Sequence, residues 1–137
     1  MTTVSPPKHR ILIVEDDAGV REGLRALLTD MDFDVVGEAA DGSEGVDLTL
    51  ELDPDVVLMD MRMPVMGGVE AARRIHRTKP EIQVVILTAY DDPALKSEAV
   101  DAGVYAFLVK GCSARLIGEV ASTASQMRRS FDDSDRF

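Results

Sequence analysis

The sequence predicts an α/β domain built on a doubly wound parallel sheet of five strands with five helices. Strand-like and helix-like patterns alternate along the chain, and this alternation is typical of a parallel sheet. The strand-like runs are nearly continuous in Val, Ile and Leu, which indicates strands buried on both faces. A chain of 137 residues that is 45% hydrophobic has enough apolar side chains for the core of one domain.

The first strand and helix are predicted from an apolar run and the periodic pattern that follows it. Residues 10–14 form the strand, and residues 19–31 form the helix because their apolar side chains recur at helical spacing. Asp17 suits the N-cap of this helix, where a carboxylate accepts bonds from unpaired amides of the first turn.

The second strand and helix are separated by a turn signal. Residues 35–39 form the strand, Asp41-Gly42 marks the turn, and residues 43–51 form the helix. Asp53-Pro54 ends this helix, because proline disfavours a helical conformation in the residue before it.

The third helix lies between two strongly apolar strands. Residues 55–60 form the third strand, and a loop containing Pro64 and Gly67-Gly68 leads into a helix that ends near residue 78. Residues 83–88 form the fourth strand, which again consists mainly of branched apolar residues.

The last part of the chain is predicted to hold two helices and one strand. Pro93 opens the fourth helix, because proline suits the first helical position, and Ala102-Gly103 ends it. Residues 105–110 form the fifth strand and residues 113–127 the fifth helix. Four apolar residues on one face of that helix are expected to pack on the sheet: Leu116, Ile117, Val120 and Ala124.

The two ends of the chain lack a core pattern. We expect one domain over residues 9–128, with a disordered lead at 1–8 and a disordered, polar tail at 129–137.

Charge and composition narrow the functional classes. The net charge of −10 argues against nucleic-acid binding by this chain itself. A basic cluster over residues 73–79 is best interpreted as a solvated helix face. Cys112 is a single cysteine, so an intrachain disulfide and a cysteine zinc site are excluded, and a cytoplasmic location is expected. No apolar run approaches the roughly 18 residues of a membrane span, and the polar start lacks a signal-peptide core.

Reactive side chains close four of the predicted strands. Glu15-Asp16 follow the first strand, Asp60 closes the third, Thr88 the fourth and Lys110 the fifth. Ligands of open parallel sheets bind beyond the carboxyl ends of the strands, so these groups are expected to gather at one edge.

The chemistry of this set suits a divalent metal and a phosphoryl group. Three carboxylates this close repel one another unless a cation is shared, and oxygen ligands open to water suit Mg²⁺. Asp60 is the candidate nucleophile, since a carboxylate can hold a phosphoryl group as a mixed anhydride. Lys110 is expected to pair with Asp60 and to contact phosphate oxygens, to which Thr88 offers a hydroxyl.

The chain resembles the receiver domains of two-component response regulators over residues 10–127. The acidic pair Glu15-Asp16, the segment 60–68, Thr88-Ala89 and the segment 107–110 match that family in order and spacing. The resemblance implies a flavodoxin-like sheet with strand order 2-1-3-4-5, and a signalling phosphoacceptor rather than an enzyme acting on an external substrate.

The resemblance also assigns roles at the acidic edge. It implies that Asp60 is the phosphoacceptor and that Asp16 and Asp60 bind Mg²⁺ directly. Glu15 would act mainly through metal-bound water, and the backbone carbonyl of Arg62 would complete the protein ligands.

Thr88 and Phe107 correspond by resemblance to a pair of switch residues. On phosphorylation the hydroxyl would move to the phosphoryl group and the ring would turn inward, changing the surface of the fourth helix, fifth strand and fifth helix. Tyr105, two residues before Phe107, is expected on the same strand face, so it competes for the role of the ring.

Three residues depart from the family pattern. Gly111 stands where proline usually follows the lysine, as in some members with a helix-turn-helix output, and this predicts a looser loop. Gly67 replaces a common aspartate and removes a possible helix cap. Glu15 replaces a more usual aspartate and has a longer arm.

The expected phosphodonor is a sensor histidine kinase or a phosphotransfer protein, and the downstream target stays open. The chain is interpreted as a stand-alone receiver or as the N-terminal part of a longer DNA-binding regulator, and homodimer formation is also left open. A phosphorylation-independent interaction module on the same fold is the main alternative. A true phosphatase is disfavoured, because Arg62 occupies the position two residues after Asp60 where a general acid is needed.

Overall fold

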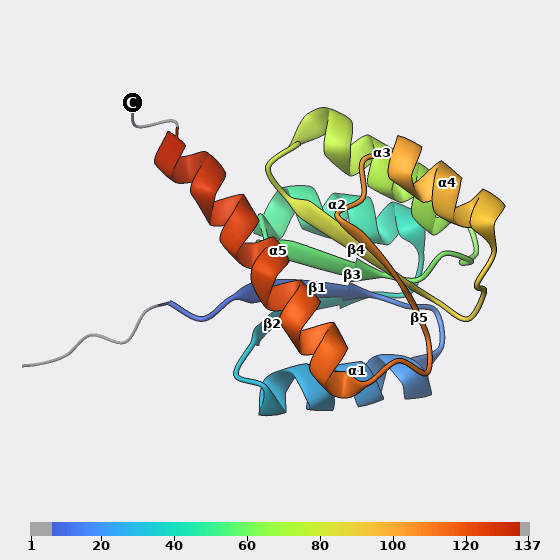
Figure 1. Cartoon of the computed structure of the whole chain (residues 1–137), viewed down its shortest axis with the longest axis horizontal. Coiled ribbons are helices and arrows are strands. Elements are labelled where there is room, and N and C mark those ends of the chain that lie inside the picture. The colour runs from blue at the N-terminus through green and yellow to red at the C-terminus, as the bar shows by residue number, and fades with distance from the viewer. Residues whose placement is uncertain (1–6, 135–137) are drawn as a thin grey trace, which may run out of the picture.

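The computed structural model describes residues 7–134, with side chains through residue 131, and forms a three-layer α/β sandwich (Figure 1). The chain alternates without exception between strands and helices in this range. In order, the elements are β1 (Arg10–Val14), α1 (Ala18–Asp30), β2 (Asp34–Ala39), α2 (Gly42–Leu52), β3 (Val56–Met59), α3 (Gly68–Thr78), β4 (Gln83–Thr88), α4 (Pro93–Asp101), β5 (Ala106–Val109) and α5 (Ala114–Ser134). The strand ranges therefore agree with the predictions to within one residue at each end.

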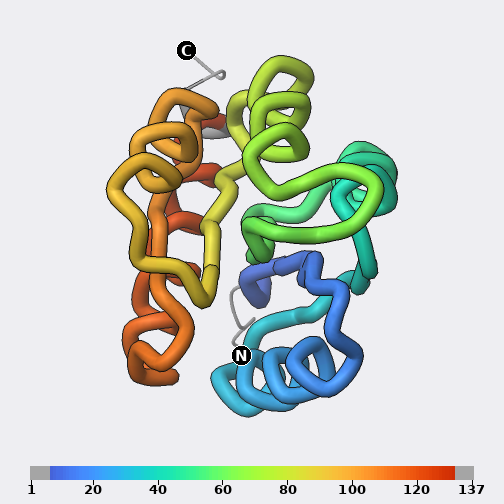
Figure 2. The backbone as a smooth tube through the Cα atoms, turned by 90° about the vertical axis from the view of Figure 1, so that its right-hand side faces the viewer, coloured from blue at the N-terminus to red at the C-terminus, as the bar shows by residue number. Residues whose placement is uncertain are grey.

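All neighbouring strands of the sheet are parallel, and their order is β2-β1-β3-β4-β5. This confirms the predicted doubly wound, flavodoxin-like topology. Since every strand runs the same way, all five carboxyl ends lie along one edge, which faces the viewer in Figure 2. We call this side the carboxyl edge of the sheet.

Two apolar clusters hold the layers together, one on each face of the sheet. Leu12 and Val14 of β1 point to the cluster covered by α2, α3 and α4. Ile11 and Ile13, which alternate with them, point to the cluster covered by α1 and α5. All four side chains are fully buried, which explains why the strands read as continuous apolar runs.

The N-caps of α1 and α3 follow the sequence expectations, and α4 has a cap that was not predicted. Asp17 accepts a hydrogen bond from the amide of Val20 at 3.0 Å, and Asp92 caps α4 ahead of Pro93. Gly67 caps α3 without a side-chain bond, as predicted from the missing aspartate. The caps place the start of each of these helices at the carboxyl edge.

The prediction of disorder from residue 129 onward is wrong for residues 129–134, where α5 continues to Ser134. The reason is a set of ion pairs at the opposite, amino edge of the sheet. Arg128 binds the Asp53 carboxylate at 3.0 Å, and Arg129 binds Asp55 at 3.3 Å. Residues 1–6 and 135–137 of the predicted disordered ends lie outside the described range.

One residue of the predicted packing face of α5 lies off the sheet. Ile117 and Ala124 are buried as expected, whereas Leu116 is 39% exposed. The helical rotation of 100° per residue carries Leu116 to the flank beside β5, where it lines a shallow hollow with Tyr105. Within the described part of the chain, no helix is both long enough and apolar enough to span a membrane.

Candidate functional site at the carboxyl edge

The three predicted acids meet where β1 and β3 end side by side. Val14 pairs with Met59 in register, and the amide of Asp60 donates to the carbonyl of Val14 at 3.0 Å. One carboxylate oxygen each from Glu15, Asp16 and Asp60 lies within 4.8 Å of the other two. The sheet therefore brings Asp60 next to Glu15 and Asp16, which lie far from it in the sequence.

Lys110 follows the edge strand β5 and reaches this cluster along the carboxyl edge. Its amide donates to the carbonyl of Thr88 at 2.6 Å, which continues the pairing of β4 and β5 past the last strand residue. Its ammonium lies 2.7 Å from Oε1 of Glu15 and 3.5 Å from Oδ2 of Asp60. The expected pairing of Lys110 with Asp60 is therefore present, and Glu15, with the longer arm, makes a second and shorter contact that was not expected.

Glu15 is held on all sides. Its side chain is nearly inaccessible, at 1% exposure for the residue, and Oε2 accepts a bond from the amide of Asp17 at 3.2 Å. Its own amide donates to the carbonyl of Ala39 in β2. A buried carboxylate needs such partners, because removing an unpaired carboxylate from water costs on the order of several kcal/mol.

The charges of the cluster shift two pKa values in the same direction. Partial burial alone would lower the pKa of Lys110, but its bond to Glu15 and the nearby Asp60 charge raise it. A hydrogen bond shared with the Glu15 carboxylate raises the pKa of Asp16, and some desolvation adds to the effect. Asp16 is thus an exposed acid that is repelled by the neighbouring Glu15 carboxylate, and a bound cation would relieve this repulsion.

Thr88 ends β4 next to Lys110, and Phe107 lies on the neighbouring strand β5. Thr88 is fully buried, and its Oγ1 accepts a bond from the amide of Tyr90 at 3.2 Å. Phe107 is half-buried and packs on the cluster under α2, α3 and α4. Tyr105 packs on the opposite cluster, so the expectation that it shares a face with Phe107 is wrong. Tyr105 precedes β5, where strict alternation does not yet hold.

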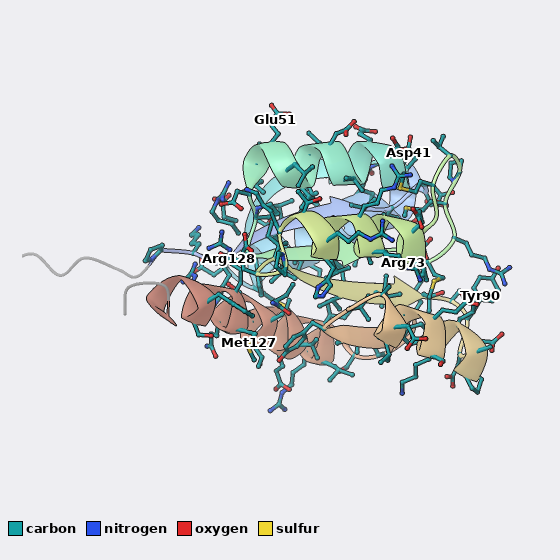
Figure 3. All side chains as sticks on the ribbon, turned by 90° about the horizontal axis from the view of Figure 1, so that it is seen from above. Asp41, Glu51, Arg73, Tyr90, Met127 and Arg128 are labelled. Atoms are coloured by element: carbon teal, nitrogen blue, oxygen red, sulfur yellow. The ribbon has the colours of Figure 1, made fainter. Side chains whose placement is uncertain are left out.

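Two loops frame the acids. In the loop after β3, the guanidinium of Arg62 lies over the ring of Tyr90 from the loop after β4, 4.0 Å from the ring centre. Tyr90 lies at the carboxyl edge, at the opposite end of the molecule from Arg128 (Figure 3). Gly68 lets the β3–α3 loop close tightly, because a Cβ there would lie 2.2 Å from the carbonyl oxygen of Asp60.

Gly111 follows Lys110 with φ +102°, a left-handed conformation that proline cannot adopt. The loop after β5 therefore takes a turn that the more usual proline of the family would forbid. The backbone conformation at position 111 therefore accounts for the presence of glycine instead of the usual proline.

Arg21 is a contact of the site that the sequence analysis missed. From the first turns of α1, its Nη1 donates to the backbone carbonyl of Glu15 at 2.7 Å. An arginine shortly after a strand-end acidic pair is the signal that could have indicated it, although helix-surface arginines are too common for that signal to stand alone.

The donor set fits Mg²⁺ by its chemistry. It consists of carboxylate oxygens, with Asp16 exposed and Asp60 partly so, and offers neither sulfur nor imidazole ligands. The fold and this edge define a class of protein: a parallel α/β domain with a cluster of three acids and a lysine at the carboxyl edge of its sheet.

The family model for the response regulator receiver domain matches residues 11–121, and the chain belongs to that family. Curated relatives agree. The transcriptional regulatory protein LiaR of Bacillus subtilis is 40% identical over 118 residues, covering 85% of this chain and 56% of LiaR. The response regulator protein VraR of Staphylococcus aureus is 37% identical over 124 residues, covering 90% and 59%. The chain thus spans about half the length of such relatives.

Solved structures agree with the fold. The signal receiver domain of the putative response regulator NarL from Mycobacterium tuberculosis has a TM-score of 0.81 at 33% identity, covering 88% of this chain and 98% of that one. A LuxR-family DNA-binding response regulator from Staphylococcus aureus has a TM-score of 0.81 at 27% identity, covering 85% and 98%. Receiver domains of this family are signalling phosphoacceptors of two-component systems.

Proposed function

We propose that Asp60 accepts a phosphoryl group from the phosphohistidine of a sensor kinase or phosphotransfer protein, with Mg²⁺ bound by Asp16, Asp60 and the Arg62 carbonyl. The observation that carries this proposal is the meeting of Asp60 with two further acids and the Lys110 ammonium at one strand edge. Packing of the fold gives little reason for such a cluster, because repulsion among the carboxylates destabilises the folded state unless they share a cation.

The proposed transfer moves one phosphoryl group between two nucleophiles. An Asp60 carboxylate oxygen forms a bond to phosphorus as the phosphorus–nitrogen bond of the phosphohistidine breaks, and the imidazole leaves with the electron pair. Mg²⁺ supplies charge neutralisation on the transferring group when it is bound. Lys110 balances negative charge on the phosphoryl oxygens, and Glu15 holds Lys110 in position. Glu15 would also help to hold the metal, through a water molecule.

The signal is proposed to leave through Thr88 and Phe107. The Thr88 hydroxyl, which now accepts from the Tyr90 amide, turns to the phosphoryl group, and the half-buried Phe107 ring moves inward behind it. These moves bias the surface of α4, β5 and α5 toward a second state. A phosphorylation-independent interaction module would not need the acids, hydroxyl and lysine to meet.

The output is proposed to be gene regulation, in keeping with the name of LiaR as a transcriptional regulatory protein. A DNA-binding segment of a longer chain, a protein partner or a second copy would carry that output in the cytoplasm. The acidic chain described here is not proposed to bind nucleic acid.

The test is intact mass after incubation with acetyl phosphate, with and without Mg²⁺. We expect one phosphoryl adduct with Mg²⁺ and none after chelation by EDTA, because the acids repel an incoming phosphate when no cation is bound. Mg²⁺ binding without any adduct from acetyl phosphate or a phosphorylated donor protein would contradict the proposal and favour the interaction module.

The Arg62–Tyr90 pair is predicted to lengthen the life of the phosphoryl group. A guanidinium stacked on a ring beside the acceptor obstructs the approach of water, and such an exposed stack is worth about 0.5–1 kcal/mol. The Arg62→Ala, Tyr90→Ala double variant should lose its phosphoryl group severalfold faster than the parent in a mass-spectrometric time course.

Each single variant at this pair should show most of that acceleration, since the stack is lost when either partner is removed. Lys96→Ala on the exposed surface of α4 is the matched control and should leave the half-life unchanged. A double variant whose phosphoryl half-life equals that of the parent would show that the stack does not shield the site.

A further inference from the structure

Arg21 contacts the backbone of the acidic loop rather than any acid of the cluster. Its Nη1 donates to the carbonyl oxygen of Glu15 at 2.7 Å, and its Nε lies 3.5 Å from Oε1 of Glu38 on β2. The side chain is only 23% exposed, so the guanidinium is packed between α1 and the edge of the sheet. We propose that Arg21 is a positioning residue that aims Asp16 at the metal site, and this inference rests on the proposed function.

The carbonyl of Glu15 belongs to the peptide that leads into Asp16. Because a peptide unit is planar, fixing the direction of that carbonyl also fixes the plane from which Asp16 begins. On its other side, the backbone amide of Glu15 donates a hydrogen bond to the carbonyl of Ala39 at 2.9 Å. With both backbone groups of Glu15 held, the backbone of Asp16 has a fixed starting direction.

Asp16 needs this outside support because its own side chain has little. It is exposed, and the neighbouring Glu15 carboxylate is the first cause of the rise in its pKa. Glu15, by contrast, is held by Lys110 and by the Asp17 amide. A ligand with little side-chain support is oriented mainly by its backbone, and partners that orient metal ligands affect metal affinity strongly.

Arg25 provides a matched control one helical turn further along α1. Its Nη1 donates to Oε2 of Glu38 at 2.6 Å, so it shares Glu38 with Arg21, yet the contact with the Glu15 carbonyl belongs to Arg21. Replacing either arginine removes one positive charge from the same face of α1. The two variants therefore separate positioning from charge.

Positioning and charge also predict opposite signs. If Arg21 acted only as a cation near the acids, its loss would make the cluster more negative and tighten Mg²⁺ binding. If it positions Asp16, its loss weakens binding, by about tenfold at the low end for such orienting partners.

The experiment is a calorimetric titration of the full chain with Mg²⁺ alone, on the parent, Arg21→Ala, Arg21→Lys and Arg25→Ala. We expect a dissociation constant raised about tenfold in Arg21→Ala, an intermediate value in Arg21→Lys, and an unchanged or lower value in Arg25→Ala. The lysine restores part of the affinity because an ammonium can still donate to the Glu15 carbonyl. Circular dichroism spectra matching the parent would exclude a general loss of structure.

Two outcomes would overturn the inference while the proposed function stands: parent-like or tighter Mg²⁺ binding by Arg21→Ala, or equal weakening by Arg21→Ala and Arg25→Ala. The second would make the shared Glu38, and not the Glu15 carbonyl, the responsible contact. A parent chain that does not bind Mg²⁺ would overturn the inference and the proposed function together.

Discussion

Asp60→Asn is expected to abolish the Mg²⁺-dependent phosphoryl adduct completely while leaving the protein folded. The amide has the shape of the carboxylate and can still accept the bond that the Met61 amide donates at 2.8 Å. It lacks the anionic oxygen that attacks phosphorus and the charge that binds the metal. Intact mass after incubation with acetyl phosphate and Mg²⁺ measures the loss.

The thermal stability of Asp60→Asn should equal or exceed that of the parent in the absence of metal. Removing one of three neighbouring negative charges relieves repulsion with Glu15 and Asp16. Asp17→Asn is the matched control, because asparagine caps a helix about as well as aspartate and Asp17 lies outside the acid cluster. This control should form the adduct as the parent does.

An adduct that persists in Asp60→Asn would move the acceptor to another residue of the chain. An adduct lost equally in Asp17→Asn would show that any charge change at this edge blocks the reaction. Either result would remove Asp60 from the role assigned to it.

Lys110→Met is expected to cost both phosphoryl transfer and stability. Methionine keeps the apolar stem but leaves the Glu15 carboxylate, 1% exposed, without its cation. Breaking a fully buried pair in this way costs about 3–5 kcal/mol. Lys110 is 29% exposed, so water screens the pair and a loss of about 2 kcal/mol is the appropriate expectation. Chemical denaturation and the adduct assay measure the two losses.

The double variant Glu15→Gln, Lys110→Met separates the two effects. Neutralising both partners removes the uncompensated charge, so the double variant should be more stable than Lys110→Met alone. It should still form the adduct poorly, because the cation that meets the phosphoryl oxygens is absent. A double variant no more stable than Lys110→Met would show that the pair with Glu15 is not what Lys110 contributes to folding.

The same pair predicts an alkaline limit to stability. The folded-state pKa of Lys110 is raised, so its contribution is complete below the ordinary lysine pKa of 10.5 and is lost as pH rises through the higher folded value. The parent should lose more stability than Lys110→Met over that alkaline range, and the difference between their denaturation midpoints measures it.

Much of the site could be predicted because each reactive residue directly follows an apolar run. Burial on both faces of a parallel sheet dictates that run, and the parallel direction dictates that all the ends share one edge. Glu15, Asp16, Asp60, Thr88 and Lys110 could therefore be placed together before any coordinates were known. The cap at Asp17 was equally local, since a cap concerns only the residues of one helical turn.

What the sequence could not provide was the choice among partners at that edge. Whether Lys110 prefers Glu15 or Asp60 depends on differences in side-chain reach of about one methylene group, set by the register of strands far apart in sequence. The bond from Arg21 to the Glu15 carbonyl depends on how α1 rotates over the sheet. Tyr105 turned to the other face because β5 begins one residue later than its apolar pattern suggests.

The sequence by itself determined the fold, the strand edge and the kinds of chemical group gathered there, because hydrophobic periodicity and strand direction are properties of short segments. Tertiary structure alone decided which of those groups touch, and it kept the last turns of α5 folded through the bonds of Arg128 and Arg129 to Asp53 and Asp55. Such contacts join residues about 75 positions apart, and their distances follow from the packing of whole helices on the sheet.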